Sequence, residues 1–276
     1  MIRYKIFDPH PLLTTFVQSI FVVDHVFESG EGEIVGQYPP TPQNCIFLYI
    51  REKFKARKVT EDKFIERSKA VIVGPQLTRM ELTVNADYRV AVIGFHPGGL
   101  FRLLGMPMEE IFDDGFDGLE LLGNDINDLV ERCAQVESFD TTCEFIENYL
   151  LGKLSRVKEL LPIDGALNEM IQYQGLIPIT QVADNACLSL RQFERKCKER
   201  VGFSPKVYAR LIRFSNAYRL FEKSEVPNWS EIAYQSGYYD QMHFIKDFKE
   251  FAGITPTMME EELKRKPLRF QTAIRF

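Results

Sequence analysis

A run of basic side chains is the segment of this sequence best suited to chemistry with an anionic partner. Between Ser189 and Arg219, nine Lys or Arg residues are opposed by two Glu residues, which leaves a net charge of +7 in 31 residues. Such cations bind DNA phosphates, and Arg, Gln and Glu can also hydrogen-bond base edges. The same run is typical of a solvated helix face, so the elements that carry it must decide between the two interpretations.

The charge of the 276 residues is unevenly distributed. Residues 1–155 hold 15 Lys and Arg against 24 Asp and Glu, a net charge of −9, whereas residues 156–276 hold 19 against 15, a net charge of +4. Because domains typically contain about 150 residues, the length of the chain predicts two domains, which we place at 1–155 and 156–276. Charge asymmetry between halves indicates a nucleic-acid-binding part beside a part with another role.

The cysteine and histidine residues lack the spacing of a metal or disulfide site. The five cysteines include no Cys-x-x-Cys pair, and the four histidines are scattered. A Gly-x-Ser-x-Gly elbow and a phosphate-binding Gly-x-x-x-x-Gly-Lys-Ser/Thr loop are also missing from the sequence. His96, in a Phe-His-Pro-Gly-Gly turn, is expected to be structural. We therefore expect no metal, no cofactor and no catalytic residue.

The chain is expected to be cytoplasmic. Its first residues do not follow the basic, apolar and small-residue order of a signal peptide, and no apolar stretch approaches ~18 residues. Reduced thiols in the cytosol are the simplest account of an odd number of cysteines. These features predict no membrane partner.

The C-terminal half contains an internal repeat with a period near 50 residues. Val182-Ala183 matches Ile232-Ala233 at an offset of 50, and Gly202-Phe203-Ser204-Pro205 matches Gly253-Ile254-Thr255-Pro256 at an offset of 51. A repeat of this length indicates duplicated supersecondary units.

Each unit is predicted to be two helices joined by a tight turn, the arrangement called helix-turn-helix. Ser189 with Gln192 three residues later predicts a capping box at the start of a helix. Gly237 stands where a left-handed turn residue is needed, and Asp240 is placed to cap the following helix. The residues expected to maintain the helix-turn-helix structure of the two units are Ala183, Ser189, Phe193, Ala233, Gly237, Asp240, Phe244, Phe248 and Pro256.

A third helix is predicted between the two units, from about Lys206 to Lys223. Its apolar residues recur at i, i+4, i+7, i+11 and i+14, which is an unbroken helical stripe. We expect this linker helix to pack against both units and to fix their separation. The stripe consists of Val207, Leu211, Phe214, Tyr218 and Phe221.

From about Leu176 to Leu263 the sequence resembles the DNA-binding domain of the AraC/XylS family of bacterial transcription regulators. The most specific part is Ile232-Ala233, Gly237-Tyr238, Asp240-Gln241, His243-Phe244, Phe248 and Gly253-Ile254-Thr255-Pro256. Three positions depart from the family pattern. Cys197 stands where Phe is usual, Pro178 where a Ser or Thr cap is common, and Lys246 where Arg is most frequent. Lys at the last position removes a bidentate contact.

The N-terminal half resembles an uncharacterised cupin-like domain that accompanies some AraC-type regulators. The resemblance rests on Pro39-Pro40 through Leu48, Val73-Gly74-Pro75-Gln76, Gly94-Phe95-His96-Pro97-Gly98-Gly99 and Leu103-Leu104-Gly105. It implies an effector-sensing or dimerising domain.

The sequence pattern of this half predicts β-rich runs followed by helices. The β-rich runs are Cys45–Ile50, Ala70–Val73 and Tyr88–Phe95, and the helical segments are Leu100–Leu104 and Asn124–Leu150. The expected fold class is therefore α+β. A β-rich cupin-like domain with trailing helices precedes an all-α domain of two helix-turn-helix units joined by a linker helix.

The second helix of each unit can enter a major groove, with the two grooves about one turn, or ~34 Å, apart. The resemblance implies base-facing positions at Arg191, Glu194, Arg195, Gln241, Met242, His243 and Lys246. Gln192, on the same face as the first three, is a further expected base contact. Arg195 could instead contact a phosphate or pair with Glu199, and His243 could act only as a cap. The expected phosphate contacts are Lys196, Lys198, Arg200, Lys206 and Lys249.

The sequence thus predicts a transcription regulator that binds specific double-stranded DNA and is not an enzyme. Its expected partners are DNA, a small-molecule effector, a second copy of the chain and, for an activator, RNA polymerase. The alternative is an enzyme of the alkylation-repair kind, with its chemistry in the N-terminal domain tethered to a DNA-binding part. That alternative requires a reactive zinc-linked cysteine cluster, which the sequence lacks. An architectural DNA-binding protein without a sensor is a third interpretation.

Overall fold

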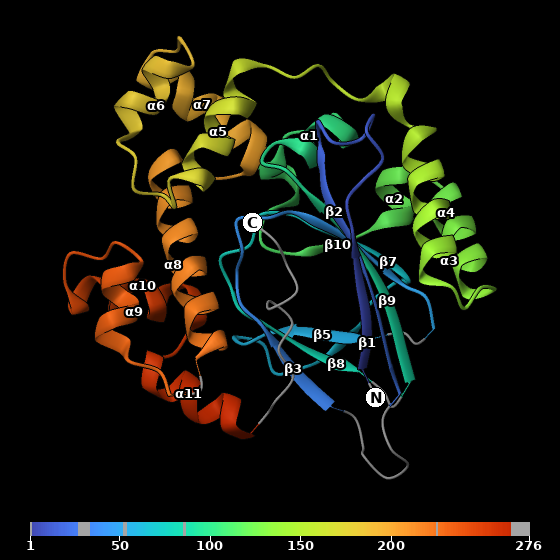
Figure 1. Cartoon of the computed structure of the whole chain (residues 1–276), viewed down its shortest axis with the longest axis horizontal. Helices are drawn as coiled ribbons and strands as arrows, with labels where there is room; N and C mark the ends of the chain where they lie inside the picture. The colour runs from blue at the N-terminus through green and yellow to red at the C-terminus, as the bar shows by residue number, and fades with distance from the viewer. Residues whose placement is uncertain (1, 27–33, 52–53, 85–86, 225, 266–276) are drawn as a thin grey trace.

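Two antiparallel β-sheets face each other in the N-terminal part of the chain (Figure 1). The computed structural model describes residues 2–26, 34–51, 54–84, 87–224 and 226–265. The larger sheet has the strand order β1-β2-β9-β4-β7-β10 and the smaller sheet the order β3-β8-β5-β6. The strands are β1 (Ile2–Phe7), β2 (Val17–Val26), β3 (Ile34–Tyr38), β4 (Cys45–Tyr49), β5 (Lys55–Lys58), β6 (Ile65–Glu66), β7 (Ala70–Val73), β8 (Met80–Val84), β9 (Asp87–Phe95) and β10 (Gly115–Asp117).

Side chains of the central strands alternate between two separate cores. In β4, Phe47 packs between the sheets, whereas Ile46 and Leu48 pack on the outer face of the larger sheet. β4 pairs with β7 on one side and β9 on the other. Because both faces of these strands are covered, they have the nearly continuous apolar sequence that the pattern predicted as β-rich. The predicted runs at 45–50, 70–73 and 88–95 are confirmed as β4, β7 and β9.

Helices cover the outer face of the larger sheet, and α3 and α4 lie on the side away from the C-terminal helices (Figure 1). The predicted helical segment 124–150 is divided into two helices because Ser138 caps the second one, its side chain accepting a hydrogen bond from the Thr141 N–H. The elements of this part are α1 (Gly99–Leu104), the 3₁₀ helix η1 (Met108–Ile111), α2 (Gly118–Leu122), α3 (Asp125–Ala134), α4 (Phe139–Leu151) and the 3₁₀ helix η2 (Leu154–Arg156).

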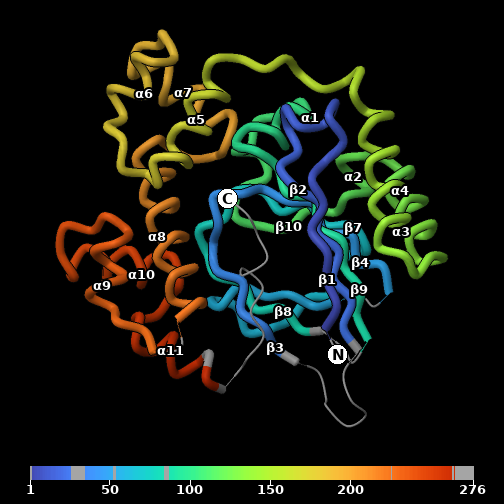
Figure 2. Tube along the Cα trace, viewed as in Figure 1, coloured from blue at the N-terminus to red at the C-terminus, as the bar shows by residue number. Residues whose placement is uncertain are grey.

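The chain then crosses from α4 to a bundle of helices, and Figure 2 shows this crossing between the two parts. The bundle has its own apolar core, built from residues between Ile163 and Met259. Its helices are α5 (Pro162–Gln172), α6 (Ile179–Asn185), α7 (Leu190–Val201), α8 (Pro205–Lys223), α9 (Trp229–Gln235), α10 (Gln241–Ala252) and α11 (Pro256–Arg265). The expected α+β class, with a β-rich part followed by an all-α part, is confirmed.

The long helix α8 joins the two helix-turn-helix units, as the apolar stripe predicted. Four of the stripe residues are buried, and Val207 is half-buried against the same core. Phe214 packs on Phe248 of the second unit with ring centres 5.3 Å apart, and Trp229 packs on Phe221 at 4.6 Å. These contacts make α8 a rigid spacer between the units.

Candidate nucleic-acid interface

Both helix-turn-helix units have the same turn geometry. In the first unit the Leu188 N–H donates to the Ala183 carbonyl (2.9 Å), and in the second unit the Tyr238 N–H donates to the Ala233 carbonyl (3.0 Å). The residue before each donor has a positive φ, +54° in the first turn and +73° at Gly237. Both alanines are buried, as expected for residues that let two helices approach closely.

The second helices of the units, α7 and α10, are called the reading helices below, and they lie beside opposite ends of α8 (Figure 1). On α7, Phe193 and Cys197 are fully buried against the core. The side chains on the opposite face point to solvent, so this helix presents a charged surface without disturbing its packing. The exposed residues of that face are Arg191, Gln192, Glu194, Arg195 and Lys198.

Gln192 serves the helix cap. Its Oε1 accepts a hydrogen bond from the Ser189 N–H (2.9 Å), while the Ser189 hydroxyl oxygen accepts from the Gln192 N–H (3.3 Å). A bidentate contact to adenine needs both the oxygen and the nitrogen of the amide. The capping box was predicted correctly, but the prediction of Gln192 as a base contact conflicts with it in this structure.

On α10, Phe244 and Phe248 are buried, and the predicted base-contact residues Gln241, His243 and Lys246 are exposed. Asp240 caps the helix by accepting the His243 N–H at 2.8 Å, and its other oxygen lies 2.7 Å from His243 Nδ1. These hydrogen bonds hold the pKa of Asp240 below its ordinary value. His243 is thus held at the start of the helix by one ring nitrogen, while the ring stays exposed.

Arg200 was predicted to contact a phosphate, and the structure contradicts this. The side chain is 4% exposed, and its guanidinium carbon lies 4.1 Å from the centre of the Phe101 ring in the N-terminal domain. Its Nε lies 3.5 Å from Oδ1 of Asp164, which is also buried. The sequence pattern missed this because the partners lie far from Arg200 along the chain. The other predicted phosphate contacts are exposed or half-buried, and they are Lys196, Lys198, Lys206 and Lys249.

A basic cleft of about 520 Å³ lies between α8 and the second unit. Arg210 in this cleft is held by Asp247 (2.7 Å) and Glu250, so its charge is already balanced within the protein. The hydrogen bonds from Arg210 to the two carboxylates, that to Glu250 foremost, raise the pKa of Arg210. The exposed Lys206 and Lys246 also line the cleft and have no ion pair within the described parts of the chain. These two ammonium groups are therefore available to an external anion.

The first unit is docked on the N-terminal domain through the end of α7. A Cβ atom added to Gly202 would lie 2.4 Å from Cγ of Pro75, so the Gly202 backbone lies directly against the Pro75 ring. The Phe203 ring packs edge-on against Phe112 with centres 5.5 Å apart. The first of these contacts connects Pro75 of the Val73-Gly74-Pro75-Gln76 motif to the helical bundle, a role that the sequence pattern did not indicate.

The second unit is docked at a separate point, through α11. Arg79, at the start of the segment leading into β8, is 5% exposed and pairs with Glu262 at 2.7 Å. The same guanidinium lies 3.9 Å from the sulfur of Met259. The N-terminal domain therefore contacts both units.

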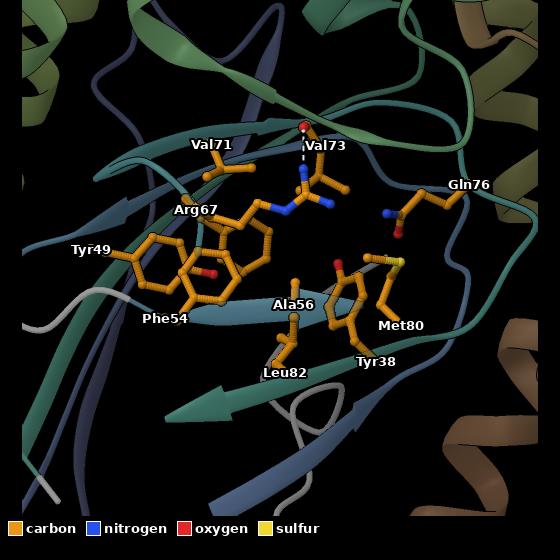
Figure 3. Close-up of a pocket in the computed structure, with 12 residues that line it drawn as sticks. Tyr38, Tyr49, Phe54, Ala56, Arg67, Val71, Val73, Gln76, Met80 and Leu82 are labelled. Carbon is orange, nitrogen blue, oxygen red and sulfur yellow. Dashed lines mark hydrogen bonds between the residues drawn. The ribbon is translucent and has the colours of Figure 1, made fainter. Parts of the chain in front are cut away.

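An aromatic cavity lies between the two sheets (Figure 3). Tyr49 and Phe54 stack with centres 3.7 Å apart, and Arg67 extends across the cavity to donate to the Gly115 carbonyl at 3.1 Å. Burial raises the pKa of Tyr38, which also lines it. The free volume is about 30 Å³, so side chains fill most of the space between the sheets.

Among the residues that the structure describes, no group of three or more His, Cys, Asp or Glu side chains is placed to hold a metal ion. In the same residues, no helix is both long and apolar enough to cross a bilayer.

Comparison with known proteins divides the chain into the same two parts. A helix-turn-helix domain family matches residues 182–262, and the domain of unknown function DUF6597 matches residues 5–117. The HTH-type transcriptional activator RhaS of Escherichia coli O1:K1 / APEC is 37% identical over 68 residues, which is 25% of this chain. That match covers 24% of the relative, so about a quarter of the curated relatives' length is represented here.

Solved structures that align with this chain include ToxT from Vibrio cholerae. Wild-type ToxT from strain SCE256, bound to an unsaturated fatty acid, is 16% identical with a TM-score of 0.48, covering 89% of this chain and 95% of that one. The DNA-binding domain of AdpA, in complex with a target DNA, is 20% identical with a TM-score of 0.37, covering 40% of this chain and all of that one.

The C-terminal part of this chain is an AraC-type helix-turn-helix domain. This match is confined to the C-terminal part of the chain, which follows an N-terminal domain of unassigned function.

Proposed function

We propose that this protein is a transcription regulator that binds a specific DNA sequence by placing α7 and α10 in successive major grooves. The observation that carries the proposal is the equivalence of the two units. Each has the same turn hydrogen bond, a buried apolar face and an exposed polar face on its reading helix. Two such helices on one rigid spacer suit grooves about one helical turn apart.

The proposed base contacts are the exposed residues of the reading helices. Arg can pair with guanine O6 and N7, Glu can accept from cytosine N4, and Gln suits adenine. Lys198, Lys206 and Lys249 are proposed to hold phosphates, with Lys196 at the edge of the same surface. The base-contact set is Arg191, Glu194, Arg195, Gln241, His243 and Lys246.

Residues 1–155 are proposed to sense an effector or to dimerise, and residues 156–276 to bind DNA. The docking of Gly202 on Pro75 and of Glu262 on Arg79 supports a regulatory role for the first part, because it contacts both units. The RhaS relative is named a transcriptional activator. If this chain also activates, RNA polymerase is a further partner.

The alternative, a cysteine-based repair enzyme, is less well supported than a regulator because four of the five thiols are buried. Burial raises the pKa of Cys45 and Cys143 to about 12 and that of Cys133 to about 11, and it also raises the pKa of Cys197. A thiol acts as a nucleophile through its thiolate, so a raised pKa lowers the reactivity of these four buried thiols at neutral pH. The fifth cysteine, Cys187, is exposed.

Genomic footprinting of the tagged full chain tests the proposal. A regulator protects a small set of sites that share two half-sites about one helical turn apart. Protection spread evenly over the genome would overturn sequence-specific binding and favour an architectural role.

A further inference from the structure

The two reading helices can be aligned position by position from their caps. Ser189 caps α7 and Asp240 caps α10, and each side chain accepts a hydrogen bond from the backbone N–H three residues later. Equivalent positions of the two helices therefore differ by 51 in residue number. This equivalence places Met242 of the second unit where the first unit has Arg191.

Met242 is apolar but lies outside the core. It is 80% exposed, whereas Phe244, two residues later, is 1% exposed. Met242 belongs to the first turn of α10, and the N-terminal residues of a recognition helix are the ones that contact base edges in a major groove. Its apolar surface is therefore in a position to be covered when α10 binds DNA.

A second exposed apolar side chain stands at the same end of α10. The turn N–H donors Leu188 and Tyr238 differ by 50 in residue number, whereas the caps differ by 51, so the second turn contains one additional residue. That residue is Tyr239, which directly precedes the Asp240 cap and is 97% exposed. The additional residue lengthens the turn but leaves the register of α10 relative to its cap unchanged.

The surface around these two side chains is basic. Lys246 lies one helical turn beyond Met242, and it lines the cleft of about 520 Å³ together with Lys206 and Tyr239. A partner that covers Met242 must therefore offer an apolar group with anions beside it. The major groove at a thymine offers both, because the 5-methyl group projects into the groove and phosphates border it.

Arg191 and Met242 favour different bases at their equivalent positions. The Arg191 guanidinium can donate two hydrogen bonds to guanine O6 and N7. The Met242 thioether has no donor, so against guanine it would leave the two base acceptors covered and unpaired, which is costly. Against thymine the same side chain buries apolar surface on both partners, and its flexibility lets it follow the methyl group.

We propose that Met242 specifies thymine in the half-site read by α10, by packing against the 5-methyl group of the base. Arg191 specifies guanine at the equivalent position of the half-site read by α7. The two half-sites therefore differ in sequence, and the protein binds its site in one orientation. This inference rests on the proposed function, because it requires α10 to enter a major groove.

Replacing single thymines by 2′-deoxyuridine, which lacks only the 5-methyl group, tests the proposal. The site is first obtained by in vitro selection from random DNA with the full chain, and each of its thymines is then replaced in turn. At one thymine or more the wild type is expected to bind about fourfold more weakly after replacement, the value of one buried methyl group. Met242→Ala should bind the thymine and uracil forms of that site equally.

Two further variants separate apolar contact from side-chain size. Met242→Leu keeps an apolar side chain and should retain the preference for thymine, whereas Met242→Gln has similar length but a polar end and should lose it. Met258→Ala, at a half-exposed methionine of α11, is the matched control and should leave the preference unchanged. The replacement of thymine changes only the DNA, so its result with the wild type does not depend on the folding of any variant.

The outcomes distinguish this inference from the regulator function. If selection enriches no sequence, the regulator function is refuted and this inference with it. An enriched site whose uracil forms all bind as tightly as the thymine form overturns the role of Met242 alone. The same conclusion follows if Met242→Gln keeps the full preference at the same thymine.

Discussion

The guanidinium carbon of Arg200, on the first reading helix, lies 4.1 Å from the centre of the Phe101 ring on α1 of the N-terminal domain. Asp164 at the start of α5 completes this contact, with Oδ1 at 3.5 Å from Arg200 Nε. Arg102 adds a second buried cation, which donates to the carbonyls of Thr15 and Lys158. A basic residue of the DNA-binding domain is thus used to join the domains.

Arg200→Ala tests this role. Removing one partner of a buried ion pair leaves the other charge uncompensated, so the free energy of unfolding should fall by about 3 kcal/mol. Denaturation with urea, followed by circular dichroism, measures the change.

DNA binding separates this role from a phosphate contact. The slope of log affinity against log salt concentration should stay the same in Arg200→Ala, whereas the exposed Lys198→Ala should reduce it by about 1. A reduced slope in Arg200→Ala would show that the side chain leaves its site and contacts DNA.

Gly202→Ala should weaken the contact between the two domains more than Gly253→Ala, which is the equivalent change in the second unit. Gly202 and Gly253 both have φ +76°, so an Ala at either position costs roughly 1–2 kcal/mol of backbone strain. At Gly202 the new methyl group would also lie 2.4 Å from Pro75 Cγ, whereas at Gly253 its nearest neighbour is Val59 Cγ2 at 3.5 Å.

The expected result in urea denaturation is a larger loss of stability for Gly202→Ala than for Gly253→Ala, by more than about 1 kcal/mol. Limited proteolysis between α4 and α5 should also become faster in Gly202→Ala. Equal losses in the two variants would mean that the contact with Pro75 contributes nothing.

The features that could be predicted from the sequence depend on neighbours along the chain. The cap at Ser189, the turn at Gly237 and the stripe of α8 each arise from residues within one or a few helical turns. The base-facing positions of the reading helices follow from the same periodicity, once the buried face is identified.

The features that could not be predicted depend on residues brought together by the tertiary fold. Arg200 was predicted to contact DNA because it belongs to a run of basic residues. The sequence of such a run does not distinguish a buried cation from an exposed one. Its partner Phe101 lies in the other domain, and helical periodicity gives no information about such pairs.

Arg195→Ala should weaken specific DNA binding by about 1–3 kcal/mol and relax the preference at one base pair. The side chain is exposed, and no ion pair joins it to Glu199 in the described parts of the chain, so the guanidinium is available. Competition binding with selected and random DNA measures both effects. An equal loss on random DNA would identify Arg195 as a phosphate contact, and Arg132→Ala, on α3 of the N-terminal domain, is the control.

His96 should make stability depend on pH in the range where imidazole titrates. Burial lowers its pKa in the folded protein, so folding favours the neutral ring. The stabilising contribution is complete above the ordinary histidine pKa of about 6.5 and is lost as the pH falls toward the lowered value. The free energy of unfolding should therefore fall more steeply between pH 7 and pH 5 in the wild type than in His96→Gln, as measured by urea denaturation. Parallel curves for the two proteins would show that the ring is protonated in the folded protein as easily as in the unfolded chain.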